Sequence, residues 1–433
     1  MNSNLKALDV NENNNISITP KLRFPDFRGA EEWKAIPLNH LAVRGKKKNR
    51  DEKIIRVLTN SAEHGVLDQR DYFDKDIATQ GKLNGYSIVE LGDYVYNPRI
   101  STTAPVGPIS KNNVATGVMS PLYTVFRFKD GDNDFYAQYF RTTGWHAYMR
   151  QASSTGARHD RMAISSEDFM AMPMPVTSAA EQRKIADCLN SVDELIVAQA
   201  RKLAAIKDHR KGLMQELFPG DGETRPHIRF PEFKNAQDWE VGPISQFAQI
   251  NPRREPMADE SEVTFVPMNA VSEDGVLAIR QLRKYGAVKK GFTAFRDADI
   301  ILAKITPCFE NGKAALVRAL ENGVGFGSTE FHVIRAQKSC LPEFLFAQIY
   351  SDKFRKVGKV SMIGTGGHQR VPALFVEDYK VSIPGLPEQQ RIVDCLSSLD
   401  DLIAGQTQKL GSLKAHKKAL VQQLFPFPKT VEA

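Results

Sequence analysis

Asparagine, proline and arginine recur together at two places, and these segments come closest to an enzyme motif in the chain. They are Asn97-Pro98-Arg99 and Asn251-Pro252-Arg253. Enzymes that methylate a base take it out of the stack, and those that act on an amino group hold it with Asp/Asn-Pro-Pro-aromatic. Both segments lack the second proline and the aromatic residue. Neither therefore predicts a methyltransferase site.

Signals for cofactors, nucleotides and metals are equally weak. Gly323–Gly327 is glycine-rich but opens no evident strand-helix-strand unit, and no Gly-x-x-x-x-Gly-Lys-Ser/Thr stretch is present to bind ATP. The four cysteines form no Cys-x-x-Cys pair, which argues against a zinc site or a disulfide framework. We expect a chain that has no active site and binds no metal or cofactor of its own.

Basic runs are the better candidates for function, because lysine and arginine suit contacts with phosphates and base edges. Arg44–Arg50 is the densest run, while the loops Thr155–Arg161 and Thr365–Arg370 combine glycine with histidine and arginine. Each could instead be a solvated surface loop. The candidate DNA-contact residues are Lys46, Lys47, Lys48, Arg50, Arg99, Arg158, His159, Arg161, Arg253, Arg254, Arg283, Lys284, Lys304, His368 and Arg370.

A repeated helix organises the elements that must position these residues. The stretch that starts at Glu181 returns at Glu388, 207 residues later, and apolar residues follow each other in both copies at alternating steps of four and three. This heptad pattern predicts two long helices that pack along a partner helix. The predicted helix-pair seam consists of Ile185, Leu189, Val192, Ile196, Leu203, Ile206 and Leu213 in the first copy and Ile392, Leu396, Leu399, Ile403, Leu410, Leu413 and Leu420 in the second.

The ends and the charges of the two helices carry further information. Ser178-Ala-Ala-Glu181 predicts a capping box, in which the serine oxygen and the glutamate carboxylate bind the first free amides. The first half of each helix is acidic and the second half basic, so an antiparallel pair would place opposite charges side by side. The same polarity could instead only complement the dipole of each helix.

The segments outside the helices are related more faintly. Residues 117–127 match 325–335 at an offset of 208, and β-rich runs such as Tyr94–Tyr96 and Ile300–Leu302 predict strands. We therefore expect an α+β chain with an internal repeat. The expected parts are a mobile leader at 1–20, a domain at 21–177, a helix at 178–219, a linker at 220–228, a second domain at 229–384, a second helix at 385–426 and a tail at 427–433.

Composition sets broad limits. The 433 residues carry a net charge of +7, which is compatible with nucleic acid but does not require it. No apolar run reaches the ~20 residues that span a bilayer, and the start lacks a signal-peptide core. We expect a cytoplasmic protein without a membrane segment.

The chain resembles the specificity subunits of type I restriction-modification systems over nearly its whole length. The resemblance rests on Arg23–Phe27 and Arg229–Phe233, both Arg-Phe-Pro-x-Phe, and on Leu-Phe-Pro after each helix. It also rests on Pro387-Glu-Gln at the second helix start, which departs to Ala180-Glu-Gln in the first.

The resemblance implies two mixed α/β target-recognition domains separated by two long antiparallel helices that form a coiled coil, with a pseudo-twofold repeat. Each domain would read one half of an asymmetric bipartite DNA target, and the helices would set the spacing and dock two methyltransferase subunits. Restriction subunits would join through the methyltransferases. S-adenosylmethionine, ATP and magnesium would serve those partners and not this chain. The alternatives are a coiled-coil adaptor that binds proteins without DNA specificity, and an enzyme with an unrecognised site.

Overall fold

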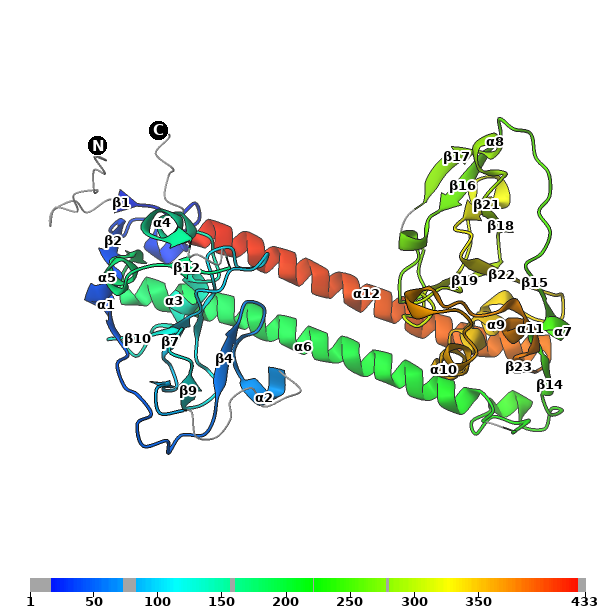
Figure 1. The fold of residues 1–433 in the computed structure, drawn as a ribbon, viewed down its shortest axis with the longest axis horizontal. Helices are drawn as coiled ribbons and strands as arrows, with labels where there is room; N and C mark the ends of the chain where they lie inside the picture. The colour runs from blue at the N-terminus through cyan, green and yellow to red at the C-terminus, as the bar shows by residue number, and fades with distance from the viewer. Residues whose placement is uncertain (1–16, 73–82, 156–159, 221, 278–279, 427–433) are drawn as a thin grey trace. The chain divides into compact units, whose positions relative to one another are not determined.

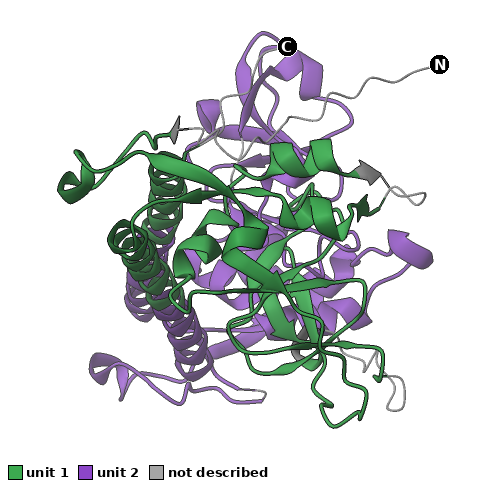
Figure 2. Ribbon diagram, turned by 90° about the vertical axis from the view of Figure 1, so that its left-hand side faces the viewer, with its two compact units in different colours: residues 1–200, 408–433 green, residues 201–407 purple. Residues whose placement is uncertain are grey.

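The structure is a computed structural model that describes residues 17–72, 83–155, 160–220, 222–277 and 280–426 (Figure 1). Most of the expected leader, the expected tail, Arg158 and His159 lie outside these residues. The chain divides into two compact units, coloured separately in Figure 2. Unit 1 comprises residues 1–200 and 408–433, and unit 2 comprises residues 201–407.

Each unit contains an antiparallel four-stranded core sheet with the same strand order. The order is β3-β10-β7-β8 in unit 1 and β15-β22-β19-β20 in unit 2. The strands are β3 (Ala42–Arg44), β7 (Tyr94–Tyr96), β8 (Ile109–Lys111), β10 (Thr124–Phe128), β15 (Ala248–Ile250), β19 (Ile300–Ala303), β20 (Ala314–Leu316) and β22 (Phe331–Ala336). The faint repeat between the two domains is therefore a repeat of fold.

A second, outer sheet is continuous in unit 2 and interrupted in unit 1. Unit 2 has the order β17-β16-β21-β18, with β16 and β21 parallel. Unit 1 has two separate pairs, β4-β5 and β6-β9, which a single parallel bridge between Val57 and Val118 connects. The strands are β4 (Leu58–Ser61), β5 (Gly65–Asp68), β6 (Ser87–Val89), β9 (Gly117–Met119), β16 (Glu262–Val266), β17 (Gln281–Lys284), β18 (Thr293–Arg296) and β21 (Val324–Gly327).

Small sheets and short helices complete both units. The remaining strands are β1 (Ser17–Ile18), β2 (Trp33–Pro37) and β13 (Pro173–Val176) in one sheet, β11 (Ser154–Thr155) with β12 (Met162–Ala163), and β14 (Glu240–Pro243) with β23 (Lys380–Ile383). The short α-helices are α1 (Leu38–Leu41), α2 (Gln69–Tyr72), α3 (Asp134–Tyr139), α4 (His146–Ala152), α5 (Ser166–Met170), α7 (Ile244–Phe247), α8 (Tyr285–Val288), α9 (Pro342–Ile349), α10 (Asp352–Val360) and α11 (Ala373–Asp378). The 3-10 helices are η1 (Pro25–Phe27), η2 (Pro231–Phe233), η3 (Met268–Ala270), η4 (Glu321–Gly323) and η5 (Gly366–His368).

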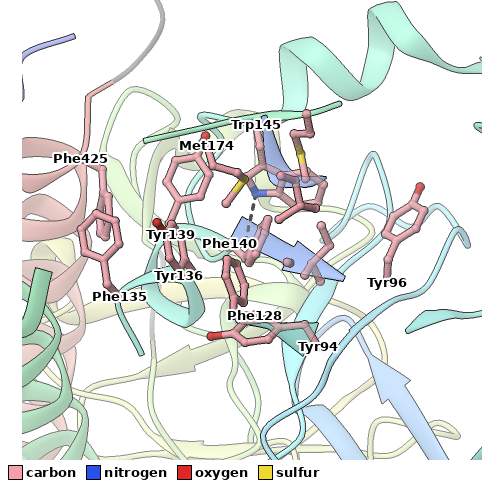
Figure 3. Packing of buried hydrophobic residues seen from close by; sticks show 14 of the residues in the cluster. Tyr94, Tyr96, Phe128, Phe135, Tyr136, Tyr139, Phe140, Trp145, Met174 and Phe425 are labelled. Carbon is pink, nitrogen blue, oxygen red and sulfur yellow. Dashed lines mark hydrogen bonds between the residues drawn. The ribbon is translucent and has the colours of Figure 1, made fainter. Parts of the chain in front are cut away.

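Aromatic side chains build the main core of unit 1. Tyr94, on β7, stacks with Phe126 at 5.5 Å between ring centroids, and the indole of Trp145 donates to the carbonyl of Phe140 at 3.2 Å. Figure 3 shows Phe425, which follows the last helix, beside Phe135 of α3, with ring centroids 5.1 Å apart. Burial of such large rings supplies most of the packing energy. Phe425 is thus part of the first unit's core.

The two long helices pack in opposite directions at both ends. They are α6 (Ala179–Leu217) and α12 (Leu386–Leu424). In unit 1, Leu189 near the start of α6 shares a core with Leu424 at the end of α12. In unit 2, Leu217 at the end of α6 shares a core with Ile392 near the start of α12. The antiparallel prediction is confirmed.

Two equivalent ion pairs accompany this packing. Lys417 of α12 donates to Asp193 of α6 at 2.6 Å within unit 1. Arg210 of α6 donates to Asp400 of α12 at 2.9 Å within unit 2. The acidic half of each helix therefore meets the basic half of the other, as its charge pattern predicted.

All residues of the predicted seam are buried or half-buried, whereas most of their helix neighbours are exposed. Ile185, Leu189, Ile392 and Leu396 are fully buried, and Val192, Ile196, Leu203, Ile206, Leu213, Leu399, Ile403, Leu410, Leu413 and Leu420 are half-buried. The heptad stripe is the face that each helix turns away from solvent.

A buried clasp closes each unit onto the start of its helix. In unit 2, Arg229 donates to both carboxylate oxygens of Glu388 at 2.7 Å, and the indole of Trp239 donates to the same carboxylate at 3.3 Å. In unit 1, Arg23 and Trp33 bind Glu181 in the same way, at 2.7 and 3.1 Å. Bidentate arginine–carboxylate pairs are among the strongest hydrogen-bonded contacts in proteins. The Arg-Phe-Pro motif and the Glu-Gln motif are thus the two halves of one contact.

This clasp corrects half of the predicted capping box. The hydroxyl of Ser178 does accept the amide of Glu181 at 3.3 Å. The Glu181 carboxylate binds Arg23, Trp33 and Thr177 and does not return to a free amide at the helix start. Burial raises the pKa of this carboxyl, but hydrogen bonds from Arg23 and Thr177 outweigh burial, so the pKa lies below its ordinary value.

Candidate nucleic-acid interface

In unit 1 the structure brings together two of the candidate DNA-contact residues. Arg99 follows the core strand β7, and Arg161 directly precedes β12. The two residues form an antiparallel backbone bridge, and the amide of Ile100 donates to the carbonyl of Asp160 at 2.9 Å. Arg99 is exposed and Arg161 half-buried.

Unit 2 repeats this arrangement with an antiparallel backbone bridge between Ile305, the residue after Lys304, and Arg370. The amide of Thr306 donates to the carbonyl of Gln369 at 2.9 Å, and the amide of Val371 donates to the carbonyl of Lys304 at 2.8 Å. Lys304 directly follows the core strand β19, which is the counterpart of β7. In both units, therefore, an arginine pairs through its backbone with the segment just beyond the third strand of the core sheet.

A short hairpin displays Arg370 and His368 in unit 2. Ile363 and Arg370 exchange two backbone hydrogen bonds of 2.9 Å and form its base. Gly364 has a φ of 126° and Gly366 a φ of 59°, and glycine adopts such angles without the steric cost of a side chain. The hydroxyl of Thr306 also donates to the carbonyl of Gly367 at 2.7 Å. The glycines and these bonds give the tip a defined shape with His368 exposed on it.

Glu330 binds Arg370 at this hairpin, although it was not among the residues predicted from sequence. The Nε of Arg370 donates to Glu330 Oε2 at 2.9 Å and its Nη2 donates to Oε1 at 2.8 Å, while Nη1 donates to the carbonyl of His368 at 3.1 Å. The hydrogen bonds from Arg370 hold the pKa of Glu330 below its ordinary value. The Arg370 side chain is 44% exposed, so a ligand can reach it. Comparison of the two repeats could not have pointed to Glu330, because the equivalent residue of the first repeat, 208 positions earlier, is Leu122 and not an acidic residue.

His332 connects the hairpin to a second candidate segment. Its Nε2 lies 2.8 Å from the carbonyl of Val371 and its Nδ1 lies 3.3 Å from the amide nitrogen of Asn251. Burial lowers the pKa of His332, and the neutral ring can donate to the carbonyl and accept from Asn251. Asn251 immediately precedes the segment with the exposed residues Arg253 and Arg254. The buried ring of His332 thus contacts both the residue next to Arg370 and the residue two positions before Arg253.

The other candidates in unit 2 lie on the outer sheet. Arg283 and Lys284 are on β17, an edge strand. Lys284 pairs with Glu260, and the Arg283 guanidinium lies 5.8 Å from the centre of the Phe265 ring. Both side chains have nearby partners, and neither lies on the two segments that carry Lys304 and Arg370.

The densest basic run of unit 1, Arg44–Arg50, is held against the neighbouring segment by backbone hydrogen bonds. The amide of Asn49 donates to the carbonyl of Tyr86 at 3.0 Å, and Lys48 forms a backbone bridge with Ser87. Lys47 pairs with Glu90 at 2.9 Å. Lys46, Lys47, Lys48 and Arg50 are all exposed, so the run is an ordered, basic edge beside β6.

Metal and membrane features are absent from the part of the chain that the structure describes. No group of three or more histidine, cysteine or acidic residues there could hold a metal ion. No helix within those residues is both long enough and apolar enough to cross a bilayer.

Comparison with known proteins finds matches to part of the chain, mostly within the second unit. The model of the type I restriction modification DNA specificity domain matches residues 236–415. The chain is 42% identical over 214 residues to the EcoEI specificity subunit of a type I restriction enzyme from Escherichia coli, which covers 47% of this chain and 35% of that protein. It is 37% identical over 238 residues to the EcoAI specificity subunit from the same organism, with 54% and 39% covered. The chain thus spans between a third and two fifths of the length of these two relatives.

A solved structure extends the likeness of fold to almost the whole chain. The crystal structure of the S subunit of a type I restriction-modification system from M. genitalium matches with a TM-score of 0.54 and 14% identity, over 94% of this chain and 99% of that one. Residues 236–415 thus match the model of the type I restriction modification DNA specificity domain, and the chain is similar over about half of its length to the specificity subunits of type I restriction enzymes.

Proposed function

We propose that this chain is the DNA-specificity subunit of a type I restriction-modification complex. Each unit reads one half of a bipartite target, and the chain itself carries out no catalysis. The observation that carries the proposal is the repeated platform: the same core sheet presents a basic side chain at Arg161 in unit 1 and at Arg370 in unit 2.

The two half-sites should differ in sequence. The core sheets agree strand by strand, but the side chains beside them do not, since Glu330 has no acidic counterpart at Leu122. Base edges are read by the side chains that reach them, whereas backbone contacts only set the register. Two units with the same core sheet but different side chains predict an asymmetric DNA target.

The helix pair sets the gap between the half-sites in this proposal. At about 1.5 Å per residue, the 39 residues of α6 and of α12 each extend about 58 Å. One turn of DNA measures about 34 Å. Readers at the ends of such helices would contact DNA more than one turn apart.

The catalytic steps belong to partner proteins in this proposal. The helix pair docks two methyltransferase subunits, and restriction subunits join through them. S-adenosylmethionine, ATP and magnesium act in those partners, next to the host DNA in the cytoplasm. The two clasps support this assignment, because each attaches a recognition domain to the start of a helix that the partners would bind.

Selection of DNA by the purified complex tests the proposal. The chain with its methyltransferase subunit is incubated with a random duplex library, and the methylated or bound molecules are sequenced. We expect two unlike half-sites separated by a constant gap. A complex with no sequence preference would favour the protein-binding adaptor, and methylation or cleavage by the chain alone would favour an enzyme.

A further inference from the structure

We infer that Arg370 reads a guanine in the half-site of unit 2 and that Glu330 is the residue that positions it. The inference rests on the proposed function, because it assigns a role within the proposed reading surface. It adds the base that is recognised and the carboxylate on which recognition depends.

The guanidinium is bound on one side and open on the other. Its five N–H groups include two that bind Glu330, at Nε and Nη2, and one at Nη1 that binds the carbonyl of His368. Within the described residues, these contacts leave one N–H on each terminal nitrogen. Guanine presents two acceptors, O6 and N7, in the major groove, and a bidentate arginine is their commonest partner.

The backbone around Arg370 holds the side chain in place before any ligand binds. Arg370 exchanges two hydrogen bonds with Ile363. Lys304 links the two segments that carry the ion pair, since its amide donates to the carbonyl of Glu330 at 2.9 Å and its carbonyl accepts from the amide of Val371, the residue after Arg370, at 2.8 Å. A side chain that is ordered in advance loses less entropy on binding. This geometry suits selective recognition.

The negative charge of Glu330 indicates whether Arg370 contacts a base or a phosphate. The Glu330 carboxylate lies 2.8 Å from the guanidinium and would repel a phosphate that approached it. A guanine edge has no net charge and avoids this repulsion. The ion pair therefore favours a base edge over the DNA backbone as the ligand of Arg370.

The test compares Arg370→Gln and Glu330→Gln in the complete complex with its methyltransferase subunit. Binding is measured on duplexes that change each base pair of the target in turn, at several salt concentrations. For Arg370→Gln we expect a loss of discrimination of roughly 5- to 150-fold at one G·C pair of one half-site, the range typical of a bidentate contact. The other positions and the salt slope should not change.

Two further measurements separate base reading from general effects. Replacement of that guanine by 7-deazaguanine, which lacks the N7 acceptor, should weaken binding of the unchanged protein but not of Arg370→Gln. Arg318→Gln is the matched control, since Arg318 is an exposed arginine of unit 2 paired with Glu343 and remote in sequence from the hairpin. It should leave all base preferences unchanged.

Glu330→Gln distinguishes positioning from simple repulsion. If Glu330 positions Arg370, discrimination should fall at the same G·C pair. If Glu330 only repels DNA, the variant should bind all sequences more tightly with discrimination intact, which would overturn its role. A uniform loss for Arg370→Gln, with a salt slope smaller by about one, would mean a phosphate contact and overturn the guanine assignment. An unchanged protein without any sequence preference would instead refute the proposed function.

Discussion

Loss of the Glu388 carboxylate should strongly destabilise unit 2. The side chains of Arg229 and Glu388 are 8% and 4% exposed, so Glu388→Ala leaves a buried guanidinium without its counter-charge. Removal of one partner of a buried pair costs about 3–5 kcal/mol. At about 2–4 °C per kcal/mol for a domain of this size, the midpoint of thermal unfolding should fall by roughly 6–20 °C.

The matched control is an exposed pair in the same unit. Arg225 and Asp238 are 58% and 50% exposed, and Asp238→Asn should cost no more than about 1 kcal/mol. The double variant Arg229→Met with Glu388→Gln removes both charges and keeps an acceptor for Trp239. It should be more stable than Glu388→Ala, because no unpaired charge remains buried.

Calorimetry gives the unfolding midpoints, and fluorine NMR assigns the change to a unit. Of the three tryptophans, Trp239 is the one in unit 2, so in a 5-fluorotryptophan-labelled chain its resonance should move while those of Trp33 and Trp145 stay. If Glu388→Ala lost no more stability than Asp238→Asn, the clasp would not hold the unit together and the reasoning would be wrong. A double variant that was the least stable of the three would refute it as well.

Three further outcomes follow from the structure. The pKa of Glu181 is lowered in the folded chain, so its contribution to stability is present above its unfolded pKa and lost as pH falls through the folded value; the gap in unfolding midpoint between the unchanged chain and Glu181→Gln should therefore shrink from pH 7 to strongly acid pH, and a constant gap would contradict the paired carboxylate. Leu203→Glu with Leu410→Glu places charges in the half-buried seam and should loosen the helix pair and disrupt the assembly, which native mass spectrometry would detect; an intact, active complex would count against the role of the helices. Exchange of residues 34–160 for another recognition domain should alter one half-site only, as methylation mapping would show, and a change in both half-sites would contradict independent readers.

The helices could be predicted from sequence because their information is periodic and repeated. The alternating spacing from Ile185 onward defined the buried face, and the acidic and basic halves favoured the direction of packing that Lys417–Asp193 and Arg210–Asp400 now exhibit. The match at offset 208 likewise predicted that the two units share a fold. Local patterns and their repetition were sufficient for these features.

Contacts between distant segments could not be predicted in this way. Glu330 and Arg370 lie 40 positions apart, and the repeat gives no hint of their contact because unit 1 has a different residue at the first position. Both halves of the clasp were noticed as motifs, but nothing in the sequence said that Arg229 binds Glu388. The charge density of Lys46–Arg50 likewise gave no sign that the backbone of this run pairs with the neighbouring strand, and its contact with DNA stays a prediction.

The clasp also bears on how such a chain could acquire a new target. Arg23, Trp33 and Glu181 lie at the two borders of the first reader, and Arg229, Trp239 and Glu388 lie at the borders of the second. Both units use the same three residue types in the same geometry. A gene fragment that encodes everything between the two borders of a unit could therefore be replaced by recombination without loss of the clasp. Specificity could then change in a single exchange, with one crossover at each border, while the helices and the three residues at the borders stay as they were.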